Sequence, residues 1–287
     1  MRGQPFGGPI KGYSVAAKRR FDAKKGHMMK LTRYLAASLM ACAGTFATAT
    51  GANAQAAETG KWTATVTPRY QHVFFKIFDA EGVESMSTFG GTIAVREPSQ
   101  RWGLAGTFLT GTKNNGDYVL DGTSDIYKYR VKRQEVQITG EFTPSDTGIT
   151  LLGGYHRFKF EQNETLTNPR PGNSENNDYR FTLDAAEIGL RLASRLGADS
   201  AQSISAQFLF GIGSGRLKDN LQENGFIDGG DQKGTGYAAD VALGYNIFVT
   251  NNLSLGARAR GYVFYVDVDR SDPLFALIPE LNLSFRF

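Results

Sequence analysis

Cysteine is almost absent from this sequence. The 287 residues hold a single one, Cys42, so no intrachain disulfide can form. Cys42 also lies in a segment that we expect to be removed, which would leave the mature chain without a thiolate to bind a metal. Only three histidines are present, and one of them lies ahead of the same segment. We therefore expect no metal site and no cofactor.

Long apolar runs and an excess of positive charge are also missing from most of the chain. After residue 54 no apolar stretch approaches the ~20 residues that a membrane-spanning helix needs. Residues 1–54 hold nine of the 32 basic residues but only one of the 28 acidic ones, so 23 basic and 27 acidic residues remain beyond them. The net charge of +4 therefore comes from the leader, and we expect no nucleic-acid partner.

The leader has the organisation of an export signal. A short basic segment begins at Met29, residues 34–50 are apolar and rich in small side chains, and Ala52-Asn53-Ala54 is an A-x-A cleavage site. An uncleaved anchor and lipidation at Cys42 are the alternatives to cleavage before Gln55. We therefore divide the chain into an upstream extension that is not native to the protein, a signal peptide and a mature part: residues 1–28, 29–54 and 55–287.

Apolar and polar residues alternate through the mature part, most clearly at its end. Every second residue from Phe275 to Phe287 is apolar, and the residues between them are polar from Glu280 to Arg286. A period of two with one apolar face predicts a strand. Nine further segments show the same alternation: residues 62–75, 86–97, 102–108, 136–142, 149–155, 179–195, 204–212, 237–247 and 253–265.

The connections between these segments alternate in length. Those after the second, fourth, sixth and eighth segments are short, whereas several of the others are long and rich in Asn, Asp and Gly: 112–124, 162–178 and 218–233. Short turns on one side and long loops on the other are typical of transmembrane barrels. We therefore expect an all-β, closed antiparallel barrel of about ten strands, with eight strands as the alternative, short periplasmic turns and long extracellular loops.

The chain resembles the Gram-negative outer-membrane β-barrel superfamily, with OmpA-like and small porin-like proteins as the broad type. The resemblance rests on Ala52-Asn53-Ala54 and on the terminal segment Leu281–Phe287, and it covers residues 61–287 by pattern. It implies that the barrel-assembly machinery reads the aromatic end at Phe285 and Phe287. It also implies an outer-membrane location, with membrane lipid and lipopolysaccharide as neighbours. We expect a monomer.

The polar phase of the strands would line the lumen of such a barrel. It carries both signs of charge, and arginine dominates the cations, as suits pairing with carboxylates. These side chains could form ion pairs that hold the barrel closed, or a constriction that selects ions. Arg258 and Arg260 are the first candidates for selectivity. The full set of candidates is Arg258, Arg260, Glu280, Arg286, Asp240, Glu187, Arg191 and Glu141.

Two irregularities interrupt the pattern. The apolar phase changes within Asp184–Ala186, which predicts a bulge. Pro68 and Pro279 lie on the outward phase of the first and last segments, where a closed barrel offers no free edge for a proline. Several strands also exceed the ~9–11 residues that cross a bilayer, and we expect the excess to carry polar residues on both faces.

Histidine bears on the question of catalysis. His156 lies between Tyr155 and Arg157, so it matches neither the Asp-x-His element of omptin-type proteases nor the His-x-Ser element of lipid A deacylases. We therefore expect no enzyme and assign no catalytic residue; an outer-membrane hydrolase is a remote alternative. The sequence favours a small porin-like channel for ions or polar solutes. The alternative is a structural or surface-interaction barrel with a plugged lumen.

Overall fold

The computed structural model describes most of the mature part of the chain. The predicted signal peptide, its cleavage site, Cys42 and residues 1–28 lie outside the described residues. The described stretches are residues 61–77, 84–119, 126–144, 148–167, 175–196, 201–223, 226–268 and 273–287.

Ten β-strands make up nearly all of these stretches. None of the described residues forms a helix long and apolar enough to cross a membrane. In chain order the strands are β1 (Thr63–Ile77), β2 (Glu84–Arg96), β3 (Trp102–Val119), β4 (Ile126–Phe142), β5 (Ile149–Leu166), β6 (Glu175–Leu196), β7 (Gln202–Glu223), β8 (Phe226–Thr250), β9 (Leu253–Asp267) and β10 (Leu274–Arg286).

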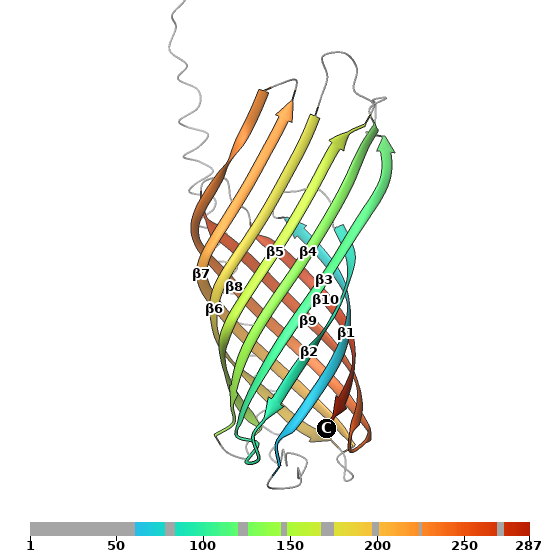
Figure 1. The fold of residues 1–287 in the computed structure, drawn as a ribbon, viewed down its shortest axis with the longest axis vertical. Coiled ribbons are helices and arrows are strands. Elements are labelled where there is room, and N and C mark those ends of the chain that lie inside the picture. The colour runs from blue at the N-terminus through green and yellow to red at the C-terminus, as the bar shows by residue number, and fades with distance from the viewer. Residues whose placement is uncertain are drawn as a thin grey trace, which may run out of the picture. The chain divides into compact units, whose positions relative to one another are not determined.

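The sheet closes on itself. Each strand pairs antiparallel with its neighbours in the chain, and β1 pairs with β10 (Figure 1). The last residue takes part in closure, because Phe287 N donates to Ala64 O at 2.9 Å and Ala64 N donates to Phe287 O at 3.1 Å. A closed sheet has no edge whose hydrogen bonds lipid would leave unmade. The expected all-β closed antiparallel barrel is confirmed, with ten strands rather than eight.

The long polar connections are mostly strand, which differs from the long loops expected at this end. β7 runs to Glu223 and β8 resumes at Phe226, so most of the expected loop 218–233 is a paired ribbon. Likewise β5 extends to Leu166 and β6 begins at Glu175. Segments rich in Asn, Asp and Gly are typical of turns. Here, pairing with a neighbouring strand satisfies the backbone groups of these segments equally well.

The predicted bulge in β6 is wrong. β6 pairs with β5 and β7 through Asp184–Ala186 without a shift in register. Phe181 and Leu183 are fully buried inside the barrel, whereas Ile188 is 69% exposed on the outer face. The backbone therefore keeps one phase along β6. The apolar side chains face inward in its first half and outward in its second half, which is what changes the sequence pattern.

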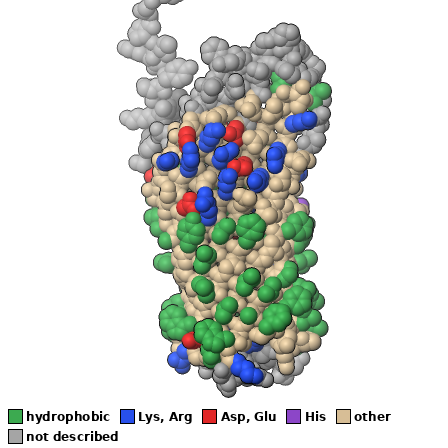
Figure 2. All heavy atoms as spheres, in the orientation of Figure 1, with side chains coloured by type: hydrophobic (Ala, Val, Ile, Leu, Met, Phe, Trp, Pro, Cys, Tyr) green, Lys and Arg blue, Asp and Glu red, His purple; other side chains and the backbone are tan. Residues whose placement is uncertain are grey.

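This exchange of polarity divides the barrel into two zones along its axis. In the zone nearer the C-terminus the outer face is apolar, as at Leu281, which is 62% exposed, and Figure 2 shows it as a green band. In the other zone the outer face is charged, and the inner face next to the first zone is apolar. On β5 the change falls between outward Tyr155 and outward Arg157, beside inward Phe158. The expected polar residues on both faces are not found directly above this change, where the inner face is apolar; further along β5 the inward phase does become polar, at Gln162 and Glu164.

Each zone matches a different solvent. An apolar exterior gains nothing from water and fits hydrocarbon, while a charged exterior around an apolar core is the arrangement of a water-soluble barrel. The first zone, the lipid zone, therefore spans the membrane. The second, the water zone, projects beyond it from the end opposite the C-terminus. The extra strand length is accounted for by this projection.

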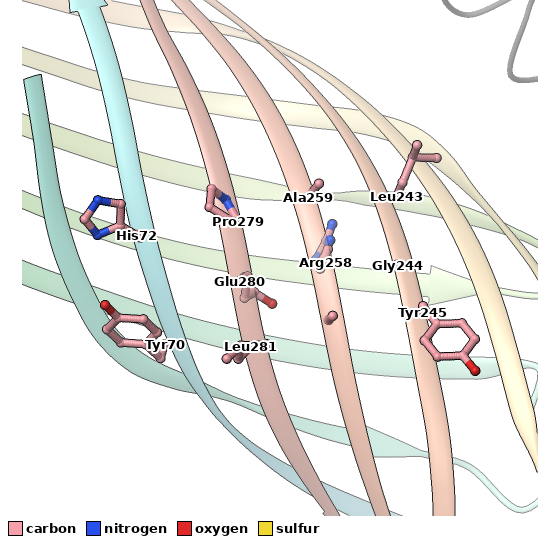
Figure 3. Close-up of a pocket in the computed structure, with 11 residues that line it drawn as sticks. Tyr70, His72, Leu243, Gly244, Tyr245, Arg258, Ala259, Pro279, Glu280 and Leu281 are labelled. Atoms are coloured by element: carbon pink, nitrogen blue, oxygen red, sulfur yellow. The ribbon is translucent and has the colours of Figure 1, made fainter. Parts of the chain in front are cut away.

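The closing pair of strands contains a weak point. Pro68 on β1 and Pro279 on β10 both face outward, and neither has a ladder partner across this seam among the described residues. A proline lacks the N–H that the ladder would use. A hollow of about 500 Å³ lies over the seam on the outer wall, between Tyr70 and His72 on one side and Leu243 and Tyr245 on the other (Figure 3).

Two adjacent glycines on β5 test how closely the strands approach. A Cβ on inward Gly154 would lie 2.0 Å from Ile138 O, whereas the nearest atom to a Cβ on outward Gly153 is 3.9 Å away. We predict that Gly154→Ala lowers the free energy of unfolding by on the order of 3 kcal/mol and that Gly153→Ala changes it by less than about 0.5 kcal/mol. Urea unfolding in lipid vesicles measures both, and equal effects would contradict the close approach.

Candidate functional site

The lumen gathers the charged side chains of the lipid zone and is the candidate site. It is filled in layers, and all ten strands contribute inward side chains that are buried. From the C-terminal end, a small ion-pair cluster is followed by a large network of charges and then by an apolar layer in the water zone. The layers follow from register, because each strand places one inward residue at each level.

The first layer centres on Glu141 of β4. Arg191 donates through Nη1 to Oε1 at 3.0 Å and through Nη2 to Oε2 at 2.8 Å, and Arg96 also donates to Oε2. Paired N–H donors on one carboxylate form the strongest kind of ion pair in proteins. The two arginines come from β2 and β6, so the carboxylate ties together strands that do not neighbour each other in the sheet.

The second layer includes a clasp across the β1–β10 seam. Arg69 Nε donates to Glu280 Oε1 at 2.9 Å and Arg69 Nη2 donates to Glu280 Oε2 at 2.7 Å. Gln71 Nε2 donates to the same Oε2 at 2.7 Å. One level lower, the hydroxyls of Thr67 and Ser284 lie 2.9 Å apart. These side-chain bonds join the two strands at the place where the prolines interrupt the backbone ladder.

The same layer continues across the lumen through Glu135. Arg133 donates to Glu135 Oε2, and Tyr262 Oη donates to Glu135 Oε1 at 2.9 Å. Arg260 Nη2 lies 3.3 Å from Glu135 Oε1 and 3.1 Å from Asp240 Oδ2. The guanidinium of Arg260 also lies over the ring of Tyr262, 4.2 Å from its centroid. Side chains from β4, β8 and β9 thus meet across the barrel axis.

His156 completes the network between two carboxylates. Its Nδ1 is 2.6 Å from Glu187 Oε1, and its Nε2 is 3.4 Å from Glu135 Oε1. Gln137 Nε2 donates to Glu187 Oε2 at 2.7 Å. The imidazole is completely buried, so no substrate reaches it from either end of the lumen. His156 therefore lies between two carboxylates in the packed interior, hydrogen-bonded to Glu187, while its Nε2 has no hydrogen-bond partner among the described residues.

Charge is balanced within this second layer. Four arginines face four carboxylates at closely similar depth: Arg69, Arg133, Arg258 and Arg260, and Glu135, Glu187, Asp240 and Glu280. Buried charges are costly to desolvate unless they are paired and hydrogen-bonded. The hydrogen bonding of the layer is less complete than its charge balance. Arg258 Nη2 and Asp240 Oδ1 are buried without a hydrogen-bond partner among the described residues.

An apolar layer closes the lumen above the charges. The rings of Phe158 and Phe264 stack at 4.0 Å between centroids, Tyr262 and Phe264 stack at 5.0 Å, and Phe75 meets Phe160 edge to face at 4.9 Å. Offset and edge-to-face contacts of this kind add to the stabilisation from burial alone. Phenylalanine rings and aliphatic side chains make up most of this layer, so it offers little to hold a file of water or ions.

The candidate lumen residues all lie on the inward phase, but they do not form one site. Arg260, Glu280, Asp240 and Glu187 belong to the second layer, while Arg191 and Glu141 belong to the first. Arg258 also belongs to the second layer, where its Nη2 has no hydrogen-bond partner among the described residues. Arg286 lies lower on β10, in register with Thr65. Phe285 and Phe287 face outward at the end of the lipid zone, where Phe287 is 76% exposed.

Several members of the network were not identified from the sequence. His156 was considered only as a catalytic residue, although its phase opposite to Tyr155 places it inside the barrel. Tyr262 and the apolar layer were missed, because inward positions were expected to be polar. The available signal was the change at Arg157, where charge moves to the outward phase and phenylalanine to the inward one.

The described residues offer no obvious place for a metal ion. Among them no group of three or more His, Cys, Asp or Glu side chains has a suitable arrangement. Each carboxylate of the second layer except Asp240 has both oxygens hydrogen-bonded to protein donors. The arrangement holds strands together and neutralises buried charge.

Comparisons with known proteins find solved structures only. No family model matches the chain, and no curated protein matches its sequence. The translocator domain of the autotransporter NalP from Neisseria meningitidis has a TM-score of 0.47 at 9% identity, covering 93% of this chain and 98% of its own. The protease OmpT from Escherichia coli scores 0.44 at 10% identity, covering 80% and 97%, respectively. Ail of Yersinia pestis scores 0.38 at 12% identity, covering 79% and 99%.

The chain is a closed antiparallel β-barrel of the transmembrane type. The closed sheet and its apolar outer band carry this assignment on physical grounds, since only a barrel without edges lets strands cross a bilayer. The three solved barrels differ in role from one another.

The clasp at the seam makes a double-mutant prediction. Glu280→Leu leaves Arg69 buried without a carboxylate, and Arg69→Leu leaves Glu280 without its paired donors. We predict that each single change lowers the free energy of unfolding by roughly 3–5 kcal/mol and that the double variant loses clearly less than the sum. Urea unfolding in vesicles provides the values. Strictly additive losses would show that the pair does not act as a clasp.

Proposed function

We propose that this protein is a closed-lumen outer-membrane barrel that acts through its outer surface and not by passing solutes. The observation that carries the proposal is the filled cross-section of the lumen, where buried inward side chains from all ten strands meet. Of the two functions that the sequence suggested, this supports the plugged, surface-interacting barrel over the porin-like channel. Ten strands enclose a lumen narrow enough for side chains to fill.

The energetics of the lumen favour the same function. An ion crossing the second layer would have to separate pairs such as Arg69–Glu280, and breaking a buried pair costs several kcal/mol. It would then meet the stacked rings of Phe158 and Phe264, and an aromatic ring cannot replace its hydration shell. Selective pores instead offer sites that bind ions weakly and release them.

Catalysis forms no part of the proposal. A general base must lie within hydrogen-bonding reach of a bound substrate. His156 is the histidine with the strongest acidic partners, and it is sealed inside the barrel. His72 faces outward near the seam, where its Nδ1 lies 3.3 Å from Ser87 Oγ and no carboxylate is paired with it among the described residues. In the described part of the chain, His72 and Ser87 therefore lack the third group that would orient the imidazole as a base.

The C-terminal strand supports a proposed route of assembly. Phe285 and Phe287 lie on the outer, lipid-facing side, so both are accessible to an assembly factor before the barrel closes. Pairing of Phe287 with Ala64 then makes this strand part of the final seam. We propose that the barrel-assembly machinery recognises β10 and that the finished barrel is a monomer.

Conductance across a planar bilayer tests the closed lumen. We predict that the inserted protein gives no defined single-channel steps, because both the charged and the apolar layers block the path. A known porin in the same bilayer serves as the positive control. Unboiled and boiled samples should migrate differently on a denaturing gel, and this difference verifies that the protein is folded. Defined steps that change in an Arg258→Ala/Arg260→Ala variant would instead support the porin-like function.

A further inference from the structure

A second hollow, distinct from the one over the seam, lies on the outer wall of the lipid zone across β1–β4. Its volume is about 480 Å³, within the range of ligand-binding clefts. Gly91 and Gly106 form its floor, and the larger side chains of Ile93, Phe108 and Ile138 stand at its sides. A Cβ on Gly106 would meet nothing within 4 Å, so the space above this residue is open. The lining of the hollow is mainly apolar, as a binding site for a hydrocarbon chain requires.

Cations begin immediately above this hollow. Val136, which lines it, lies opposite Arg157 in the β4–β5 register, and the next outward pairs are Gln134 with Lys159 and Lys132 with Glu161. Successive outward positions on a strand are about 6.6 Å apart. Two outward steps therefore lead from the rim of the hollow to Lys132.

These cations belong to a basic patch in the water zone. The outward positions of β4, β5 and β6 above the lipid zone carry six cations and three carboxylates, and Figure 2 shows such charges gathered above the green band. The patch consists of Lys128, Arg130, Lys132, Arg157, Lys159 and Arg180, with Glu161, Asp178 and Asp184.

Positive charge exceeds negative charge in the patch even after local pairing. Glu161 is shared, since Lys159 Nζ lies 2.7 Å and Arg180 Nε 3.0 Å from its Oε1. Burial would raise the pKa of Glu161, but the hydrogen bond and charge of Lys159, together with Arg180 and Lys132, hold it below its ordinary value. Arg157 is only loosely paired with Asp184, at 3.6 Å, and its side chain is 56% exposed.

We propose that the hollow and the basic patch together bind one phosphorylated glycolipid of the outer leaflet, of the lipopolysaccharide class. One acyl chain occupies the hollow over Gly106, and the phosphates contact Lys132, Arg157 and Lys159. The phosphates of such a lipid lie at the boundary between hydrocarbon and water, which is the level at which these cations begin. This inference deepens the proposed function by naming what the outer surface binds.

The seam hollow does not carry the same inference. Above it, the outward positions of β1 and β10 are occupied by Phe74 and Leu277, which are 39% and 59% exposed. No comparable group of cations follows there among the described residues. An apolar chain alone would leave an anionic headgroup without partners at that place. The combination of hollow and cations distinguishes the β1–β4 site.

Binding in detergent micelles tests the site. Purified full-length protein is titrated with lipopolysaccharide, and native mass spectrometry counts the bound molecules and gives the Kd. We expect one tight site, with affinity that falls as ionic strength rises. Enzymatically dephosphorylated lipopolysaccharide and phosphatidylcholine should bind at least tenfold more weakly, and inorganic phosphate should not displace the glycolipid.

Two variants test the two halves of the site. Lys132→Gln/Arg157→Gln/Lys159→Gln should weaken binding at least tenfold, because each cation near a membrane surface contributes to holding an anionic lipid. Arg216→Gln/Lys233→Gln removes positive charge from β7 and β8 without touching the residues of the patch, and should bind like the unaltered protein. Gly106→Leu places a side chain in the hollow from a Cβ position that has no atom within 4 Å, and should also weaken binding about tenfold or more. Gly153→Leu adds the same side chain to β5, outside the hollow, and is its control.

Unaltered affinity in either test variant, or equal binding of the dephosphorylated lipid, would overturn the site. Unboiled gel migration shows which variants are folded before they are titrated. The outcome is independent of the lumen: a protein that conducts ions but binds the glycolipid would contradict the closed barrel alone. A protein that neither conducts ions nor binds the glycolipid would contradict this inference alone.

Discussion

Pairing between β1 and β10 is the interaction on which the rest of the structure depends. Hydrocarbon cannot satisfy a free strand edge, so the lipid zone is stable only when the sheet closes. The closing pair is interrupted by Pro68 and Pro279, and the Arg69–Glu280 ion pair joins the same two strands from inside. The buried charges of the lumen therefore have a structural task, which is to hold the barrel closed where its backbone ladder is weakest.

Closure also explains why the interior is filled and the exterior is divided. Below the level of Arg157 the strands face lipid, so polar residues turn inward and pair with one another across the lumen. Above it the strands face water, so charge turns outward and phenylalanines such as Phe158 pack inside. The boundary between the two arrangements brings basic side chains next to an apolar wall. Because side chains fill the lumen, the outer face is the surface on which this barrel can bind a ligand.

Much of the architecture follows from local pattern, whereas the lumen network does not. The alternation ending at Phe287 predicts an outward apolar face because a strand has a period of two. Opposite phase places Arg260 and Glu280 inside by the same rule. The meeting of Glu135 with Arg260 depends on the size and stagger of the barrel, which link residues 125 positions apart and leave no local signal. The change of polarity in β6 was read as a bulge because Phe181 was assumed to face lipid.

Access of water to the lumen is the most direct test of this account. In a Cys42→Ser background, single cysteines at Ala185 and Thr88 lie within the apolar and charged layers, where both native residues are buried, while Ser214 is exposed on the outer face of β7. A membrane-impermeant maleimide should label a cysteine at Ser214 readily. It should leave cysteines at Ala185 and Thr88 unlabelled until the barrel is unfolded. Labelling of the folded lumen positions at the rate of the Ser214 position would contradict a closed barrel.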